Sequence, residues 1–246
     1  MVFSIQQYYK DKFIYRFGSN EDVPEGLIVQ LIYGAAKKEY GDLRYYAGAE
    51  VARAKKFNFG YLTTTFSYGL FFNRSIANDI TAKYKLFFLA NLVKKGRWYF
   101  REFLNYSIVH GENKLASEVV TLRSDEMYGF NSTSLAGKTK MVLNFETVAY
   151  APYTLIGFRF AGVAMAGLGI VVSSQNKIEN SPLYQAYSIG IMTRNENLVS
   201  STFQISFGMY PFLPNGDNNV FLFNPVTSFT LRVRGFSMGR PEFISY

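Results

Sequence analysis

Few residues of this chain have side chains suited to acid–base catalysis or metal binding. His110 is the only histidine and cysteine is absent, so we predict no metal site and no other cofactor. A serine nucleophile would need His110 as its general base. Ser107 lies three residues earlier, and on an extended strand this spacing directs the two side chains to opposite faces. A catalytic pair would therefore need a distant serine, and the candidates are Ser67, Ser117 and Ser124.

Basic side chains are the second group of interest. The net charge is +8, and much of it falls in doublets where apolar-alternating runs end. A nucleic-acid site would gather its cations on one face or one helix, so we predict no nucleic-acid partner. Cations at strand ends are typical of a solvated rim or of a surface that faces anionic lipid head groups. The doublets are Lys37-Lys38, Lys55-Lys56 and Lys94-Lys95.

The elements that must position these residues are predicted to be strands. Hydrophobic residues make up 48% of the 246 residues and aromatic residues 18%, a composition that favours strands. Apolar and polar residues alternate with period two in about a dozen segments. The predicted strands are Lys12–Gly18, Gly26–Ala36, Leu43–Arg53, Asn58–Phe72, Asp79–Leu92, Arg97–Val109, Thr139–Ala149, Thr154–Val171, Leu183–Arg194, Val199–Tyr210 and Val226–Phe236, with a weaker segment at Phe3–Tyr9.

Many of these strands are as long as a tilted strand that crosses a bilayer. One face of each is apolar and the other polar, a pattern shared by soluble sandwiches and membrane barrels. Strand length, aromatic content and the cations at strand ends favour the membrane. We therefore predict one domain, residues 1–246, an antiparallel up-and-down transmembrane β-barrel of about 12 strands. Its polar inner wall would include Lys83, Lys85, Arg232 and Arg234.

The lengths of the connections between the predicted strands distinguish the two ends of the barrel. Short gaps alternate with longer ones, as in outer-membrane barrels, and the longest spans residues 110–138. One residue does not fit, because Glu102 shares the parity of Trp98, Phe100 and Leu104 on the expected lipid face. Either a β-bulge resets the parity or a partner covers that face.

The long loop and the strands after it resemble the sixteen-stranded barrels of the outer-membrane assembly and secretion superfamily, which includes BamA-like proteins and two-partner-secretion transporters. In that family a long extracellular loop precedes the last five strands, folds into the barrel and carries a Val/Ile-Arg-Gly-Phe/Tyr motif. Met127-Tyr128-Gly129-Phe130 stands in the corresponding place. Asn144-Phe145-Glu146 is similar to the Asn-Leu-Glu of the next family strand, and Ile244 and Tyr246 resemble its terminal assembly signal.

The main departure from the family motif is at Tyr128. Tyr128 stands where the motif has an arginine, so the family's ion pair inside the barrel is altered. Glu146 and Arg159 have inward parity and could pair with each other instead. The resemblance implies that the chain supplies the last 12 strands of a sixteen-stranded barrel; the alternative is a complete twelve-stranded barrel whose signal peptide was removed.

The resemblance also implies function. We expect a protein of the bacterial outer membrane that inserts or translocates other proteins mechanically, without enzymatic activity. Expected partners are outer-membrane lipids and lipopolysaccharide, client proteins and accessory lipoproteins. A passive channel or structural barrel with a cationic lumen is the alternative. An outer-membrane lipase that uses His110 is a third hypothesis.

Overall fold

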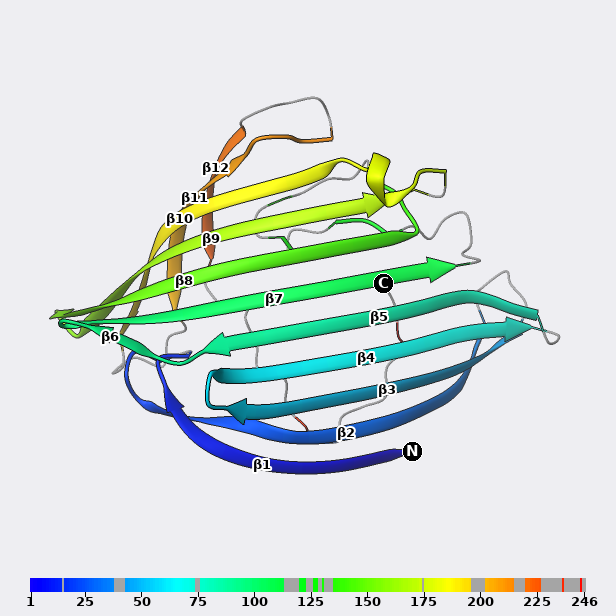
Figure 1. Cartoon of the computed structure of the whole chain (residues 1–246), viewed down its shortest axis with the longest axis horizontal. Coiled ribbons are helices and arrows are strands. Elements are labelled where there is room, and N and C mark those ends of the chain that lie inside the picture. The colour runs from blue at the N-terminus through cyan, green and yellow to red at the C-terminus, as the bar shows by residue number, and fades with distance from the viewer. Residues whose placement is uncertain are drawn as a thin grey trace.

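The computed structural model describes residues 1–14, 16–37, 43–73, 76–112, 120–122, 126–127, 130, 135–173, 175–195, 202–214, 220–226, 236 and 244, with side chains left out at 73, 76–78 and 220–226. The described residues are predominantly β (Figure 1). The strands are β1 (Val2–Lys12), β2 (Asn20–Lys37), β3 (Leu43–Phe57), β4 (Gly60–Asn73), β5 (Ile76–Ala90), β6 (Val93–Lys95), β7 (Trp98–Glu112), β8 (Thr139–Leu155), β9 (Phe158–Val172), β10 (Leu183–Asn195), β11 (Phe203–Tyr210) and β12 (Val220–Val226).

These strands form one antiparallel sheet. Its order is β1-β2-β3-β4-β5-β7-β8-β9-β10-β11-β12, and the short β6 pairs with β7. Each strand lies beside its neighbour in sequence, so the prediction of an all-β antiparallel fold is confirmed. The described strands form an open sheet, because β1 pairs only with β2 and β12 only with β11. Among the described residues, no helix is long and apolar enough to cross a membrane.

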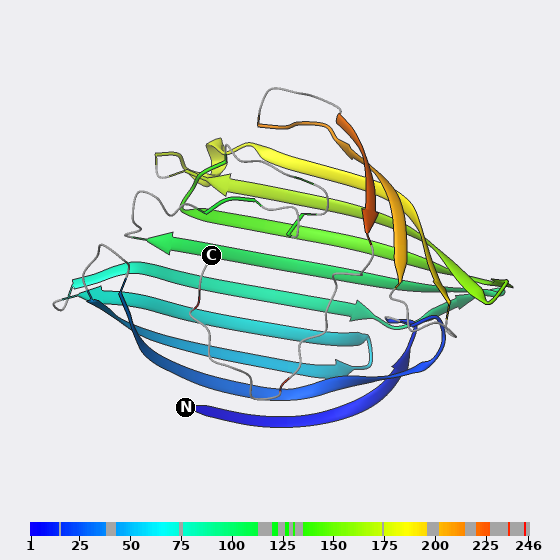
Figure 2. The same ribbon diagram turned by 180° about the vertical axis from the view of Figure 1, so that it is seen from behind.

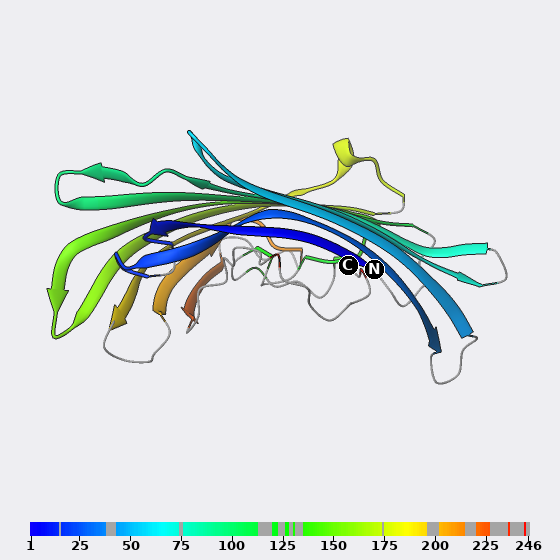
Figure 3. The same ribbon diagram turned by 90° about the horizontal axis from the view of Figure 1, so that it is seen from below.

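The sheet is curved (Figure 3), and its two faces differ in chemistry. On the convex face, large apolar side chains are exposed on β2, β3, β4, β8, β10 and β11. On the concave face, polar residues are buried, among them Thr65, Ser67, Arg101, Lys140 and Gln204. The exposed convex residues include Leu31, Tyr33, Tyr45, Val51, Phe66, Tyr68, Phe145, Ile189, Ile191, Phe203, Ile205 and Phe207.

The connections gather at two rims. The turns β3–β4, β5–β7 and β8–β9 lie at one end of the sheet, which we call the short-turn rim, while β7–β8 and β9–β10 connect at the opposite end, the long-loop rim (Figure 1). The predicted alternation of short and long connections holds only in part. The β4–β5 connection at the long-loop rim spans only residues 74–75, whereas the β1–β2 connection at the short-turn rim spans 13–19. The longest connection runs from 113 to 138, at the long-loop rim.

Two strand predictions at the chain ends are wrong. The predicted strand Lys12–Gly18 is instead the connection between β1 and β2, and β2 already begins at Asn20. Phe13 leaves the sheet with a φ of 60°, a left-handed conformation that interrupts an extended strand. Near the other end, the sequence predicts a strand only from Val226 onward, whereas β12 already runs from Val220 to Val226 and includes Pro225, a residue that an edge strand tolerates.

Candidate functional site

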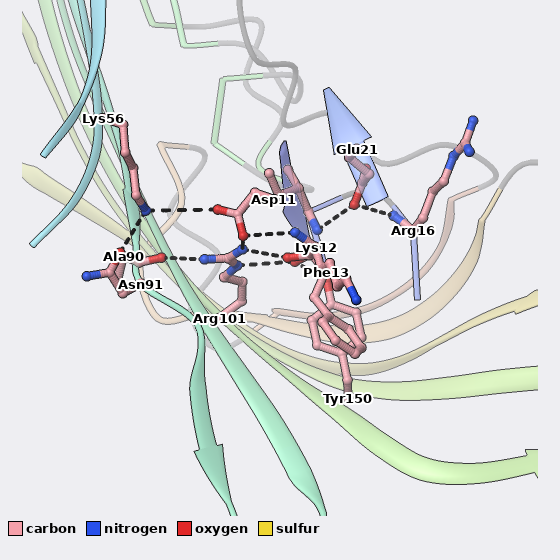
Figure 4. A network of polar contacts seen from close by, with 11 residues as sticks. Asp11, Lys12, Phe13, Arg16, Glu21, Lys56, Ala90, Asn91, Arg101 and Tyr150 are labelled. Atoms are coloured by element: carbon pink, nitrogen blue, oxygen red, sulfur yellow. Dashed lines mark hydrogen bonds and ion pairs between the residues drawn. The ribbon is translucent and has the colours of Figure 1, made fainter. Parts of the chain in front are cut away.

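The concave face is filled at the short-turn rim by the β1–β2 connection, residues 13–19, which Arg101 of β7 anchors. The Arg101 side chain is 0% exposed. Its Nη2 donates to Asp11 Oδ1 at 2.5 Å and to the Lys12 carbonyl at 2.5 Å. Its Nη1 donates to the Ala90 carbonyl at 2.9 Å and its Nε to the Phe13 carbonyl at 3.4 Å. We call these contacts the Arg101 network (Figure 4).

Neighbouring polar groups extend the Arg101 network across the sheet (Figure 4). Lys56 Nζ lies 4.0 Å from Asp11 Oδ2 and donates to Asn91 Oδ1 at 2.7 Å. Glu21 Oε1 accepts the backbone N–H groups of Ile14 at 2.9 Å and Arg16 at 3.1 Å. The Lys12 and Phe13 carbonyls and the Ile14 and Arg16 N–H groups therefore find side-chain partners here, which replace the hydrogen bonds that these groups would make in a strand.

Apolar side chains of the same connection pack onto the concave face. Ile14 and Phe17 are buried against β7, β8 and β9 in one core cluster, together with Phe236 from near the C-terminus. Phe13 stacks on Tyr99 at 4.7 Å between ring centroids, and Phe17 meets Tyr150 edge-on at 5.2 Å. This core occupies the short-turn half of the concave face.

A second anchor holds the β7–β8 connection against the other half of the concave face. Lys140 of β8 is buried, and its Nζ contacts both carboxylate oxygens of Glu126 at 2.7 Å. The same ammonium donates to the Thr121 carbonyl at 3.0 Å. Asn144 Nδ2 donates to the Glu126 carbonyl at 2.6 Å. A charged pair and two backbone contacts therefore tether the loop to one strand.

Apolar residues of that loop complete the anchor, and Figure 2 shows the ribbon from the side on which the described pieces of the loop lie. Phe130 is 0% exposed, and its ring lies 5.5 Å from that of Tyr184 and 6.3 Å from that of Tyr210. Met127 is buried beside Gly167 of β9, where a Cβ would lie 2.9 Å from Met127 Cγ. Glycine at this position is what lets the loop approach the strand so closely.

The predicted loop motif and terminal signal are only partly described. Phe130 is buried as above, whereas Tyr128 and Gly129 lie outside the described residues. Ile244 donates its backbone N–H to Tyr46 Oη at 2.8 Å, which places it over the concave face. Tyr246, Arg232 and Arg234 also lie outside the described residues.

The predicted wall residues of β5 face the concave side. Lys83 lies opposite Ser67 and Val109, and Lys85 opposite Thr65 and Ser107. Ser67 Oγ donates to Glu50 Oε2 at 2.7 Å, so this strip of the wall carries both signs of charge. The concave face of β3, β4 and β5 is therefore not purely cationic.

The expected pairing of Glu146 with Arg159 is wrong. Glu146 lies opposite Met165 in the β8–β9 register, whereas Arg159 lies near the short-turn rim opposite Thr154. Arg159 Nη1 donates instead to the Phe17 carbonyl and so helps to anchor the β1–β2 connection. Shared parity put both residues on one face, but their distance along the strands keeps them apart.

Glu146 is left buried, and its Oε1 has no hydrogen-bond partner among the described residues. A buried carboxyl oxygen without a partner carries a desolvation cost. We therefore expect Glu146→Met, which removes the polar group and keeps most of the side-chain volume, to raise the free energy of unfolding by about 1–3 kcal/mol, measured by urea unfolding in detergent at neutral pH. Glu146→Gln, which leaves a buried polar group at the same place, is the control and should gain less. Destabilisation by Glu146→Met would show that this carboxyl group has a partner.

His110 hydrogen-bonds Thr139 rather than a serine, with 2.7 Å between Nδ1 and Oγ1. His110 has the parity of the convex face, whereas Ser107 and the buried Ser67 have that of the concave face. Ser117 and Ser124 lie outside the described residues. Among the described residues, therefore, neither Ser67 nor Ser107 lies beside His110, the base that the lipase hypothesis requires.

Glu102 lies on the convex face without a bulge. The β7–β8 register runs from Tyr99 to His110 with no shift, so of the two explanations offered for Glu102 the β-bulge is wrong. Thr147 lies directly opposite on β8, and its hydroxyl group donates a hydrogen bond to Glu102 Oε2, with 2.6 Å between the oxygens. The carboxylate is thus partly satisfied within the sheet.

Two ion pairs that hold loops on the concave face were not predicted from the sequence. They are Arg101 with Asp11 and Lys140 with Glu126. Parity could have flagged Arg101 and Lys140, because each is a cation on the inward side of a strand with an apolar outer face. Their acidic partners lie outside every predicted strand. Asp11 falls between Phe3–Tyr9 and Lys12–Gly18, and Glu126 falls in the long loop, where periodicity carries no signal. Comparison with protein-family models, curated proteins and solved structures gives no match to this chain.

Proposed function

We propose that this chain forms the wall of a transmembrane β-barrel in the bacterial outer membrane, with its convex face in contact with lipid. The observation that carries the proposal is the exposed apolar surface of the convex face. Soluble monomers rarely expose contiguous apolar patches beyond a few hundred Å², whereas here large apolar side chains are exposed on β2, β3, β4, β8, β10 and β11, and most of those on β5, β7 and β9 between them are half-buried. A lipid environment stabilises this arrangement and water does not.

The filled concave face favours a mechanical role over a constantly open pore. Residues 13–19 pack over one half of it, and the loop carrying Phe130 packs over the other. Non-covalent contacts that include an ion pair hold each of them, Arg101–Asp11 for the first and Lys140–Glu126 for the second. Such contacts can break and re-form without any change in covalent bonds. This supports a barrel of the protein-insertion or translocation type, as the resemblance implies, in which an inward loop regulates access to the interior.

A spanning sheet must also satisfy its edges. The outer edges of β1 and β12 have no neighbouring strand in the described part of the chain, and unpaired backbone groups are costly in lipid. Closure in the membrane therefore requires further strands, supplied by residues beyond the described ones or by another chain. Glu102, half-buried among apolar neighbours of the convex face, is the position where a membrane partner would find a polar contact.

Refolding from urea into phosphatidylcholine vesicles tests membrane insertion and the closed state together. We expect β-sheet circular dichroism only with vesicles present, and little current across a planar bilayer that contains the protein. We expect Lys140→Met with Glu126→Gln to release the loop and raise both the frequency and the size of current steps. The matched control is Lys138→Met, an exposed lysine two residues away.

Each outcome separates the hypotheses. A folded, monomeric protein in buffer without lipid or detergent would overturn the membrane proposal. Large, steady current from the unaltered protein would favour the passive channel.

A further inference from the structure

The short-turn rim carries exposed cations on several neighbouring strands. They come from the end of β1, the end of β3 and the β6–β7 hairpin, which lie at the same end of the sheet (Figure 1). None forms an ion pair with a carboxylate of the described residues. These rim cations are Lys10, Lys12, Arg53, Lys55, Lys94, Lys95 and Arg97.

Among the described residues, most carboxylates at the same rim are turned inward and occupied. Asp11 binds Arg101, Glu21 accepts the N–H groups of residues 14 and 16, and Glu25 accepts the N–H of Lys56. Asp22 is exposed, and it lies opposite Lys10 in the β1–β2 register. The outer surface of this rim is therefore strongly positive in its described part.

The long-loop rim does not share this excess in its described part. Its exposed Lys37, Lys138 and Lys177 are accompanied by exposed Glu112 and Glu179. Arg44 there is paired with Asp79 at 3.6 Å. The positive charge thus distinguishes one end of the sheet from the other.

Exposed aromatic rings lie among the rim cations. Lys94 Nζ lies 5.7 Å from the centre of the Tyr99 ring, and the Arg97 guanidinium lies 5.4 Å from that of Tyr153. Trp98 stands opposite Lys95 in the hairpin. Aromatic residues of this kind sit at the level of the head groups in membrane proteins. Cations beside them are within reach of lipid phosphates.

We propose that the short-turn rim binds anionic phospholipid head groups, through Lys94, Lys95 and Arg97 of the β6–β7 hairpin and the neighbouring rim cations. This inference rests on the proposed membrane location and adds the class of lipid that one leaflet supplies. One cation near a charged surface contributes about 1 kcal/mol, which corresponds to about fivefold in the occupancy of the single head group that it contacts. The anionic head group supplies the counter-charge that Lys94, Lys95 and Arg97 do not find among the described carboxylates.

Trp98 makes this testable, because it is the only tryptophan in the chain and lies within the cluster. The protein is reconstituted into phosphatidylcholine vesicles that contain a fixed fraction of brominated lipid, either phosphatidylglycerol or phosphatidylcholine. We expect brominated phosphatidylglycerol to occupy sites beside Trp98 about fivefold more often, as judged from fluorescence quenching. The preference should fall with increasing salt.

Charge reversal gives the matched comparison. The triple variant Lys94→Glu, Lys95→Glu, Arg97→Glu should lose the preference while quenching by brominated phosphatidylcholine remains. Lys138→Glu with Lys177→Glu, at the opposite rim, should keep it. The neutral triple variant Lys94→Gln, Lys95→Gln, Arg97→Gln, expected to lose the preference as well, serves if charge reversal prevents insertion.

The outcomes separate this inference from the proposed function. If neither brominated lipid quenches Trp98, the membrane location itself fails. If both lipids quench the unaltered protein equally, the protein is in the membrane and only the head-group site is wrong. Selectivity that survives in the triple variants would also overturn the assignment.

Discussion

Arg101→Met should destabilise the folded protein by about 3–5 kcal/mol, the cost of leaving one partner of a buried ion pair alone. The substitution keeps most of the side-chain volume but removes every donor of the Arg101 network. The Asp11 carboxylate then loses its charged partner, and the Lys12, Phe13 and Ala90 carbonyls each lose a donor. Urea unfolding in detergent, followed by circular dichroism, measures the loss.

The same substitution should also free residues 13–19 from the concave face. Protease cleavage near Arg16 in the membrane-inserted protein is the expected sign. Arg97→Met, four residues earlier on an exposed side chain, should change stability by less than about 0.5 kcal/mol. Asp11→Ala combined with Arg101→Met should cost less than the sum of the two, because both belong to one network. Additive costs, or a small effect of Arg101→Met alone, would contradict the role assigned to this arginine.

Ile189→Arg should destabilise the membrane-inserted protein by about 2–4 kcal/mol, the cost of a cation at the middle of a lipid-facing strand. Ile189 is 68% exposed at the centre of β10, opposite Ala164 and Phe207. An exposed position of a soluble protein would tolerate the change, so a large effect on this residue reports lipid contact. The measurement is the free energy of unfolding from vesicles in urea.

A control on the same strand and the same face sharpens that result. Leu183 begins β10 at the long-loop rim, and an arginine near the interface should cost only about 0–1 kcal/mol. The gradient between positions 183 and 189 is therefore the prediction. Equal, small effects at both positions would mean that the convex face meets water or another protein rather than lipid.

The sequence by itself determined the all-β class, the antiparallel order of neighbouring strands and the face of most side chains. Period-two alternation is a local property, since successive side chains of a strand point to opposite sides. It therefore assigned Phe207 and Ser206 of β11, or Lys140 and Met141 of β8, to the correct faces without knowledge of the fold. The prediction that residues 110–138 form the longest connection likewise needed only the end of one alternating run and the start of the next.

The tertiary structure alone decided what fills the concave face. Asp11 and Arg101 are 90 residues apart in sequence, and nothing in the alternation of either strand indicates that they meet. Residues 12–18 alternate well enough to be predicted as a strand, but their backbone is held by side chains from β2, β7 and β9 instead. Glu146 and Arg159 share a face and yet do not meet, because parity fixes the side of the sheet and not the position along it. Pairing between distant residues depends on register and curvature, which are properties of the assembled sheet.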